Sequence, residues 1–189
     1  MRFTETPLAG AFVLELEPAA DDRGFFARAF CQEEFAARGM NARCAQSNIC
    51  LNRHKGTIRG MHLQLPPVAE AKLVRCTRGS LLDVIVDLRP ESTTFLRHFA
   101  VTLSGENYRS LYVPPRFAHG YQVLEDDTEL YYQMSEPYTP GFERGFRFDD
   151  PRIGISWPLQ PTVMSVKDMS LTRIDEGLLS ELEFVGAPV

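Results

Sequence analysis

The sequence predicts an all-β protein, an antiparallel sandwich or barrel with a few short peripheral helices. Two observations support this prediction. Five or more short runs of apolar and β-branched residues follow one another through the middle of the chain, and each run ends at a turn residue such as glycine, proline or aspartate. Helical patterns, by contrast, occur in only two places. Short strands at this spacing are typical of sandwiches and barrels.

The strands are expected in the following order. Phe12 to Leu16 forms an early strand, and residues 59–64 have an alternating β pattern. Residues 72–77 and 80–87 are expected to form a hairpin around Arg78-Gly79, since both runs are apolar and a glycine lies between them. The later strands, each ended by turn residues, are expected at 99–103, 108–113, 119–124 and 128–134.

The helical patterns are short and lie outside this strand-rich region. Residues 32–38 predict two turns of helix closed by Gly39, and residues 174–184 predict a terminal amphipathic helix. The stretch 137–161 combines prolines and glycines with many large apolar groups. It is therefore expected to be an ordered irregular segment wrapped on the sheet, because flexible linkers lack such groups.

Length and charge limit the possible functions. The 189 residues suit a single domain spanning 1–189, with the segment from about 170 to 189 peripheral to it. A net charge of −5 and a pI near 5.4 argue against nucleic acid or an anionic membrane as partner. The chain has no apolar signal core at its start, and its four cysteines are irregularly spaced, so we expect free thiols in a cytoplasmic protein, with Cys76 in the core.

The chemistry is indicated first by His62, which lies among cationic side chains in Arg59-Gly-Met-His-Leu-Gln64 and is followed by Lys72 and Arg75. A histidine titrates near neutrality and can take a proton from carbon, while a nearby cation stabilises the charge that develops on a neighbouring oxygen. The alternative is a half-buried histidine on a strand with no catalytic role. The rest of the chain favours the catalytic interpretation.

Four separated segments carry residues that one reaction could use. They are Asp22 to Phe26; Gln46 to Asn48 with Arg59, His62 and Lys72; Pro114 to Gly120; and the stretch from Tyr132 through Tyr138 and Glu143 to Asp168. In this order they resemble the dTDP-4-dehydrorhamnose 3,5-epimerase family of nucleotide-sugar epimerases, from about Phe12 to Asp168. Several independent motifs in one order are far more specific than any single one.

The resemblance implies a cupin-like jelly-roll β-barrel, usually a homodimer, acting on a nucleotide-diphosphate 4-keto-6-deoxyhexose without a cofactor. It also implies four catalytic roles: His62 as general base, Asp168 as its acidic partner, Tyr132 as general acid and Lys72 as the cation near the keto oxygen. The residues expected to contact substrate are Arg23, Phe26, Arg28, Gln46, Asn48, Arg59, His119, Tyr138, Glu143 and Lys167, with Tyr138 stacked on the nucleotide base.

These roles are physically reasonable. A ketone at C4 acidifies the hydrogens at C3 and C5, and removing one creates an enolate that Lys72 and Arg59 can stabilise. A carboxylate from Asp168 would orient His62 and favour the imidazolium formed after abstraction. Inversion needs a second group on the opposite face, and the hydroxyl of Tyr132 is protonated at neutral pH. Each tyrosine could instead simply pack in the core. Tyr131 lies next to Tyr132 and therefore faces the other side of the strand, where we expect it to have a packing role.

Arg23 and Arg59 adjoin glycines and could grip a pyrophosphate in bidentate fashion. The alternative for Arg23 is a surface salt bridge with Asp21 or Asp22. No metal is expected, because His62 and His119 are the only plausible ligands and two histidines are too few for a well-held site.

Three departures from the family pattern are present. Ala27-Arg28 replaces the usual glutamate after the Arg-Gly-Phe-Phe phrase, which leaves the nucleotide undefined as dTDP, CDP or another. Glu70-Ala71 displaces the usual glutamine before Lys72. Arg116 replaces a glycine and is expected to add a cation near His119.

The leading hypothesis is therefore inversion at C3, C5 or both. A 3,4-ketoisomerase on a similar nucleotide sugar is an alternative, because it also needs a base and a stabilised enolate. A non-catalytic nucleotide-sugar-binding cupin module is another, and a metal-dependent cupin dioxygenase is a more distant one.

Overall fold

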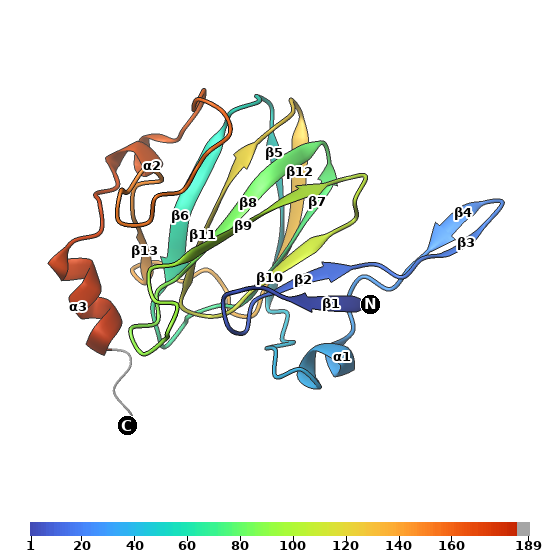
Figure 1. The fold of residues 1–189 in the computed structure, drawn as a ribbon, viewed down its shortest axis with the longest axis horizontal. Helices are drawn as coiled ribbons and strands as arrows, with labels where there is room; N and C mark the ends of the chain where they lie inside the picture. Colours follow the sequence, from blue (N-terminus) through green and yellow to red (C-terminus); the bar gives the residue numbers. More distant parts are fainter. Residues whose placement is uncertain (185–189) are drawn as a thin grey trace.

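Two antiparallel sheets pack face to face in the computed structural model, which describes residues 1–184 (Figure 1). The six-stranded sheet has the order β1-β2-β10-β7-β12-β5, and the five-stranded sheet has the order β13-β6-β11-β8-β9. A separate hairpin, β3-β4, projects from the body of the molecule. The prediction of an all-β sandwich with few short helices is confirmed.

The strands of the six-stranded sheet are β1 (Arg2–Glu5), β2 (Phe12–Glu15), β5 (Gln46–Asn52), β7 (Lys72–Arg78), β10 (Ser110–Val113) and β12 (Thr128–Met134). Those of the five-stranded sheet are β6 (Ile58–Gln64), β8 (Ser80–Asp87), β9 (His98–Ser104), β11 (Phe117–Val123) and β13 (Glu143–Gly145). The projecting hairpin joins β3 (Ala19–Asp21) to β4 (Gly24–Phe26), and the helices are α1 (Gln32–Ala36), α2 (Val166–Ser170) and α3 (Glu176–Phe184).

Strand alternation builds the core between the sheets. Val74 and Cys76 point inward from β7, and they meet Leu81, Ile85 and other buried side chains of the facing sheet. Burial raises the pKa of the Cys76 thiol to about 11. The expectation that Cys76 is an inert core residue is therefore supported, because the reactive species of cysteine is the thiolate.

The outer faces of the two sheets are covered unequally. The C-terminal segment packs Phe146, Ile153 and Ile174 on the five-stranded sheet, and α1 packs Phe35 over β2 and β10. The outer face of β5 is open, with Ile49 71% exposed. No helix among the described residues is long and apolar enough to cross a membrane.

Several expected boundaries shift. The strand expected from residue 108 begins at Ser110, because Tyr108 has a φ of 51° and cannot belong to an extended strand. The terminal helix begins at Glu176, and residues 185–189 of the expected peripheral segment lie outside the described residues. The expected irregular stretch 137–161 contains the short edge strand β13. The strands β1, β3, β4 and β5 and the helix α2 were not predicted.

Candidate active site

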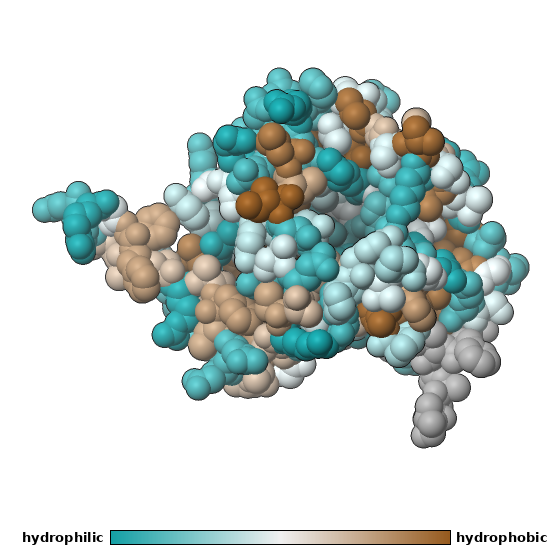
Figure 2. Space-filling model, turned by 180° about the vertical axis from the view of Figure 1, so that it is seen from behind, coloured by the Kyte–Doolittle hydropathy of each residue, from teal (hydrophilic) through white to brown (hydrophobic). Residues whose placement is uncertain are grey.

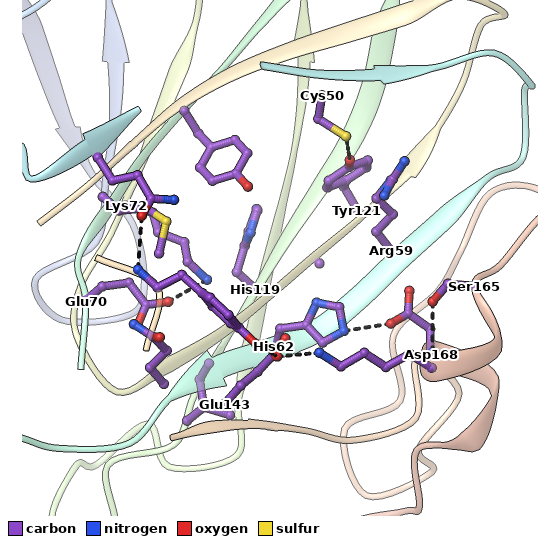
Figure 3. A pocket seen from close by; sticks show the side chains of 18 residues that line it. Cys50, Arg59, His62, Glu70, Lys72, His119, Tyr121, Glu143, Ser165 and Asp168 are labelled. Atoms are coloured by element: carbon purple, nitrogen blue, oxygen red, sulfur yellow. Dashed lines mark hydrogen bonds and ion pairs between the residues drawn. The ribbon is translucent and has the colours of Figure 1, made fainter. Parts of the chain in front are cut away.

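One end of the space between the sheets contains a cavity of about 480 Å³. Strands β6 and β11 form one wall, β5, β7 and β12 form the other, and α2 and β13 contribute to the rim (Figure 3). Ten of the residues expected at the site line it: Gln46, Arg59, His62, Lys72, His119, Tyr132, Tyr138, Glu143, Lys167 and Asp168.

The expected contact between His62 and Asp168 is present. Nε2 of His62 lies 2.7 Å from Oδ1 of Asp168, whose side chain is only 5% exposed (Figure 3). Ser165 starts α2 and accepts a hydrogen bond from the Asp168 backbone N–H at 3.0 Å, which fixes the aspartate at the rim. Burial is the largest single effect and acts to raise the pKa of Asp168, but the hydrogen bond and charge of His62, together with hydrogen bonds from Ser165 and the Gly60 backbone, lower that pKa overall.

A second histidine–carboxylate pair lies beside the first. Nε2 of His119 is 2.6 Å from Oδ1 of Asp83, a residue of β8 with no exposed surface. Sequence reasoning did not identify Asp83. A signal was present, because a carboxylate inside the apolar run 80–87 must be paired when it is buried.

Lys72 is also paired. Its Nζ lies 2.9 Å from Oε1 of Glu70, with side-chain exposures of 10% and 4% respectively. Oε2 of Glu70 is buried and has no hydrogen-bond partner among the described residues. The ammonium group is therefore held at the cavity wall by a carboxylate that stands where the family pattern has glutamine.

Tyr132 belongs to β12, in the wall opposite the one that carries His62. Burial raises the pKa of its hydroxyl, and the nearby Cys50 adds to the effect, against a smaller opposing effect of Arg59. The phenol is thus kept protonated at neutral pH. Tyr131 faces the outer side of the sheet, where its hydroxyl donates to Ser47.

The rim carries three connected groups. Lys167 forms an ion pair with Glu143, and the hydroxyl of Tyr138 donates to the same glutamate at 3.2 Å. The carboxylate raises the pKa of Lys167. Burial is the largest single effect and acts to raise the pKa of Glu143, but Lys167, His62 and Tyr138 together lower that pKa overall. The ring of Tyr138 is half exposed and available for stacking.

Arg59 contributes an exposed guanidinium to the cavity. Its Nε donates to Oδ1 of Asn52 at 2.8 Å, and Oδ1 also lies 3.4 Å from the hydroxyl of Tyr121. Gln46 accepts from the backbone N–H of Tyr138 and donates to Asn48 at 3.0 Å. Asn48 itself does not line the cavity, and it contacts the site through the hydrogen bond that it accepts from Gln46.

Three expected substrate contacts lie away from this cavity. Arg23 and Phe26 are on or beside the projecting β3-β4 hairpin, where Arg23 pairs with Asp21 and Phe26 is 79% exposed. Arg28 follows the hairpin and pairs with Glu34. The salt bridge considered for Arg23 is thus present.

Arg116 does not add a cation to the cavity as expected. It has a φ of 65°, in the left-handed region that suits the glycine of the family pattern, and its guanidinium pairs with Glu91 at 2.7 Å. Within residues 1–184, no group of three or more His, Cys, Asp or Glu side chains is arranged to hold a metal ion.

Comparison with known proteins identifies the family. The model for dTDP-4-dehydrorhamnose 3,5-epimerase matches residues 5–176. The enzyme of that name from Sinorhizobium fredii is 41% identical over 177 residues, which cover 93% of this chain and 91% of the relative.

Solved structures agree. The dTDP-4-dehydrorhamnose 3,5-epimerase from Elizabethkingia anophelis aligns with a TM-score of 0.88 and 34% identity, covering 92% of this chain and 96% of that one. An epimerase from Legionella pneumophila, in complex with dTDP-4-keto-L-rhamnose, aligns with a TM-score of 0.86 and 33% identity, covering 94% and 96%. The chain therefore belongs to the dTDP-4-dehydrorhamnose 3,5-epimerase family and is an epimerase of a nucleotide-linked 4-keto-6-deoxy sugar.

Proposed function

We propose that this chain inverts C3, C5 or both through His62 as base and Tyr132 as acid. The observation that carries the proposal is their placement in one cavity, on walls formed by different sheets. Inversion requires a proton to leave one face of the sugar and another to arrive on the opposite face. Two groups on opposite walls meet that requirement.

The proton transfers can be written atom by atom. The hydrogen bond from Nε2 of His62 to Asp168 leaves the Nδ1 lone pair to accept the carbon-bound proton. The C–H electrons move onto the C4 oxygen as an enolate, which the ammonium of Lys72 stabilises. The enolate then collapses as the hydroxyl of Tyr132 delivers a proton to the opposite face, and solvent later restores both side chains.

The net charge of the cavity lining indicates that cations from outside the cavity contribute to substrate binding. Arg59, Lys72 and Lys167 supply three positive charges, and Glu70, Glu143 and Asp168 supply three negative ones, so they sum to zero with neutral histidines. A nucleoside diphosphate brings further negative charge. Additional cations are needed for tight binding.

The β3-β4 hairpin is the best source of those cations. Figure 2 shows it standing clear of the molecule with a hydrophilic tip, and it carries Arg23 and the exposed Phe25 and Phe26. If these residues bind substrate, as the family resemblance implies, they must do so in another chain's cavity. A homodimer in which each hairpin reaches the partner's site fulfils this condition.

The open face of β5 fits the same homodimer. Ile49 and Leu51 project from its outer side and are 71% and 39% exposed, which is a natural surface to bury against a second copy. Light scattering should therefore give twice the chain mass.

A mixing experiment tests whether the hairpin is shared. The His62→Asn and Arg23→Ala proteins should each be inactive alone, and mixing them should restore activity, because one of the two sites in the mixed dimer then carries neither change. No recovery of activity would contradict sharing of the hairpin.

The reaction itself is tested with 4-keto-6-deoxy sugars linked to thymidine and cytidine diphosphates. Proton NMR in heavy water should show deuterium and inverted configuration at C3, C5 or both, with the carbonyl still at C4. A carbonyl moved to C3 would establish the ketoisomerase instead, and binding without exchange would establish the non-catalytic module. The cytoplasmic location stays a prediction.

A further inference from the structure

The basic side chains that line the cavity differ in whether a carboxylate is paired with them. His62, Lys72, His119 and Lys167 each contact a carboxylate, namely Asp168, Glu70, Asp83 and Glu143. Arg59 is the only basic lining residue without a carboxylate partner among residues 1–184, and its side chain is held by the neutral amide of Asn52. It is therefore the one cation of this cavity whose charge is not already compensated.

Asn52 is built into the sheet in a single orientation. It is 2% exposed, and its Nδ2 group donates to the backbone carbonyls of Thr128 and Cys50 at 3.3 and 3.4 Å. With the amide nitrogen committed to these carbonyls, the oxygen must face Arg59. The contact uses Nε of Arg59, and its two terminal nitrogens make no hydrogen bond within the described part of the chain.

A neutral acceptor and a charged one have different consequences at this position. A carboxylate would hold Nε more strongly but would also neutralise the guanidinium. An amide fixes the direction of the guanidinium and leaves its full charge and both terminal nitrogens for a ligand. That combination matches a phosphate group, which a guanidinium binds in bidentate fashion.

We propose that Asn52 is a positioning residue that aims Arg59 at the diphosphate of the substrate while keeping its charge uncompensated. The inference rests on the proposed function, since it requires a diphosphate-bearing ligand. It assigns to a buried amide of β5 a role in nucleotide affinity that is separate from proton transfer.

The isosteric change Asn52→Asp adds a charge at the Arg59 contact and also removes the Nδ2 donor to the two carbonyls. It keeps an oxygen against Nε of Arg59 but adds a negative charge, so the dissociation constant for thymidine diphosphate and for inorganic pyrophosphate should rise about 10- to 100-fold. Asn52→Ala removes the acceptor that orients Arg59 but leaves the charge of Arg59 uncompensated. It should raise the same dissociation constants about 2- to 10-fold. The measurement is isothermal titration calorimetry on the full chain at fixed salt.

Asn41→Asp is the matched control, because it introduces the same charge at an exposed position outside the cavity and should leave both constants unchanged. In an Arg59→Gln background, Asn52→Asp should have no further effect. Binding by Asn52→Asp that equals wild type, or that is no weaker than that of Asn52→Ala, overturns the inference.

Asn52→Ala also keeps the test decisive if Asn52→Asp does not fold, because unchanged binding by Asn52→Ala overturns the inference as well. If the wild-type protein exchanges carbon-bound protons and the Asn52 variants bind diphosphates as tightly as wild type, only this inference is wrong. A wild-type protein that neither binds diphosphates nor exchanges would remove the proposed function too.

Discussion

His62 and His119 lie directly opposite each other on β6 and β11, and Nε2 of each contacts a carboxylate. The two carboxylates come from different places. Asp168 reaches His62 from α2, 106 residues along the chain, whereas Asp83 lies on β8, the neighbour of β11. Only the His62 pair is near the rim, where Asp168 is fixed by a helix start. The same chemical unit is thus built once within a sheet and once between a sheet and a helix.

Tyr132→Phe should uncouple exchange from inversion. His62 can still remove a proton and return deuterium to the same face, but no donor remains on the other face. We expect deuterium incorporation without inversion, and epimerised product reduced about 100- to 10,000-fold. Proton NMR in heavy water measures both.

Tyr131→Phe is the control for that experiment, because its hydroxyl lies on the outer face of the sheet. It should keep full activity. Inversion at the wild-type rate by Tyr132→Phe would assign the acid to another residue.

Lys72→Met should lower kcat about 100- to 1000-fold, because the enolate oxygen loses its nearest cation at the moment charge develops. KM should change less, since the ground-state ketone carries no charge. Steady-state kinetics provides both constants. Lys55→Met, at an exposed position, is the control, and a loss confined to KM would contradict the assigned role.

Asp168→Asn should change how stability depends on pH. The pKa of Asp168 is lowered from an ordinary value of 3.8, so the ionised carboxylate stabilises the fold above that pH and loses this effect as pH falls through its lowered pKa. The difference in melting temperature between wild type and Asp168→Asn should be largest near neutrality and shrink below pH 3.8. Thermal unfolding from pH 7 to about pH 2 measures it; a constant difference would contradict the pairing.

Gly60→Ala should destabilise the fold more than Gly24→Ala by about 1–3 kcal/mol. Both glycines have a φ of +123°, so the backbone strain is matched, but only at Gly60 would a Cβ meet a neighbour, Cα of Gly120 at 2.6 Å. Urea unfolding compares the two. Equal losses of unfolding free energy would mean that the close approach of β6 and β11 adds no cost to a side chain at position 60.

The sequence predicted the strands that carry an apolar pattern, such as β7, β8 and β12, but not β5. That strand points its polar residues Gln46, Cys50 and Asn52 towards the inside of the fold and leaves Ile49 and Leu51 outside. The usual relation between polarity and exposure is therefore reversed, and the segment resembles a loop in sequence.

The site was predicted best where a motif carries the residue. The roles of His62, Lys72 and Asp168 were assigned through the family resemblance, even though His62 and Asp168 are 106 residues apart. Asp83 and Asn52 were not identified, because the resemblance assigned no role to either residue. The Ser165 to Asp168 spacing is typical of a helix start and could have located α2. The location of Arg23 away from the cavity depends on the path of the hairpin, which no local pattern determines.

The central claim is that His62 removes the carbon-bound proton. The most direct measurement is the rate of deuterium incorporation from heavy water into a 4-keto nucleotide sugar by wild type, His62→Asn and the exposed control His54→Asn. We predict that His62→Asn slows exchange about 100- to 10,000-fold while thymidine diphosphate binding is kept, and that His54→Asn matches wild type. Exchange at the wild-type rate by a folded, nucleotide-binding His62→Asn protein would contradict the account.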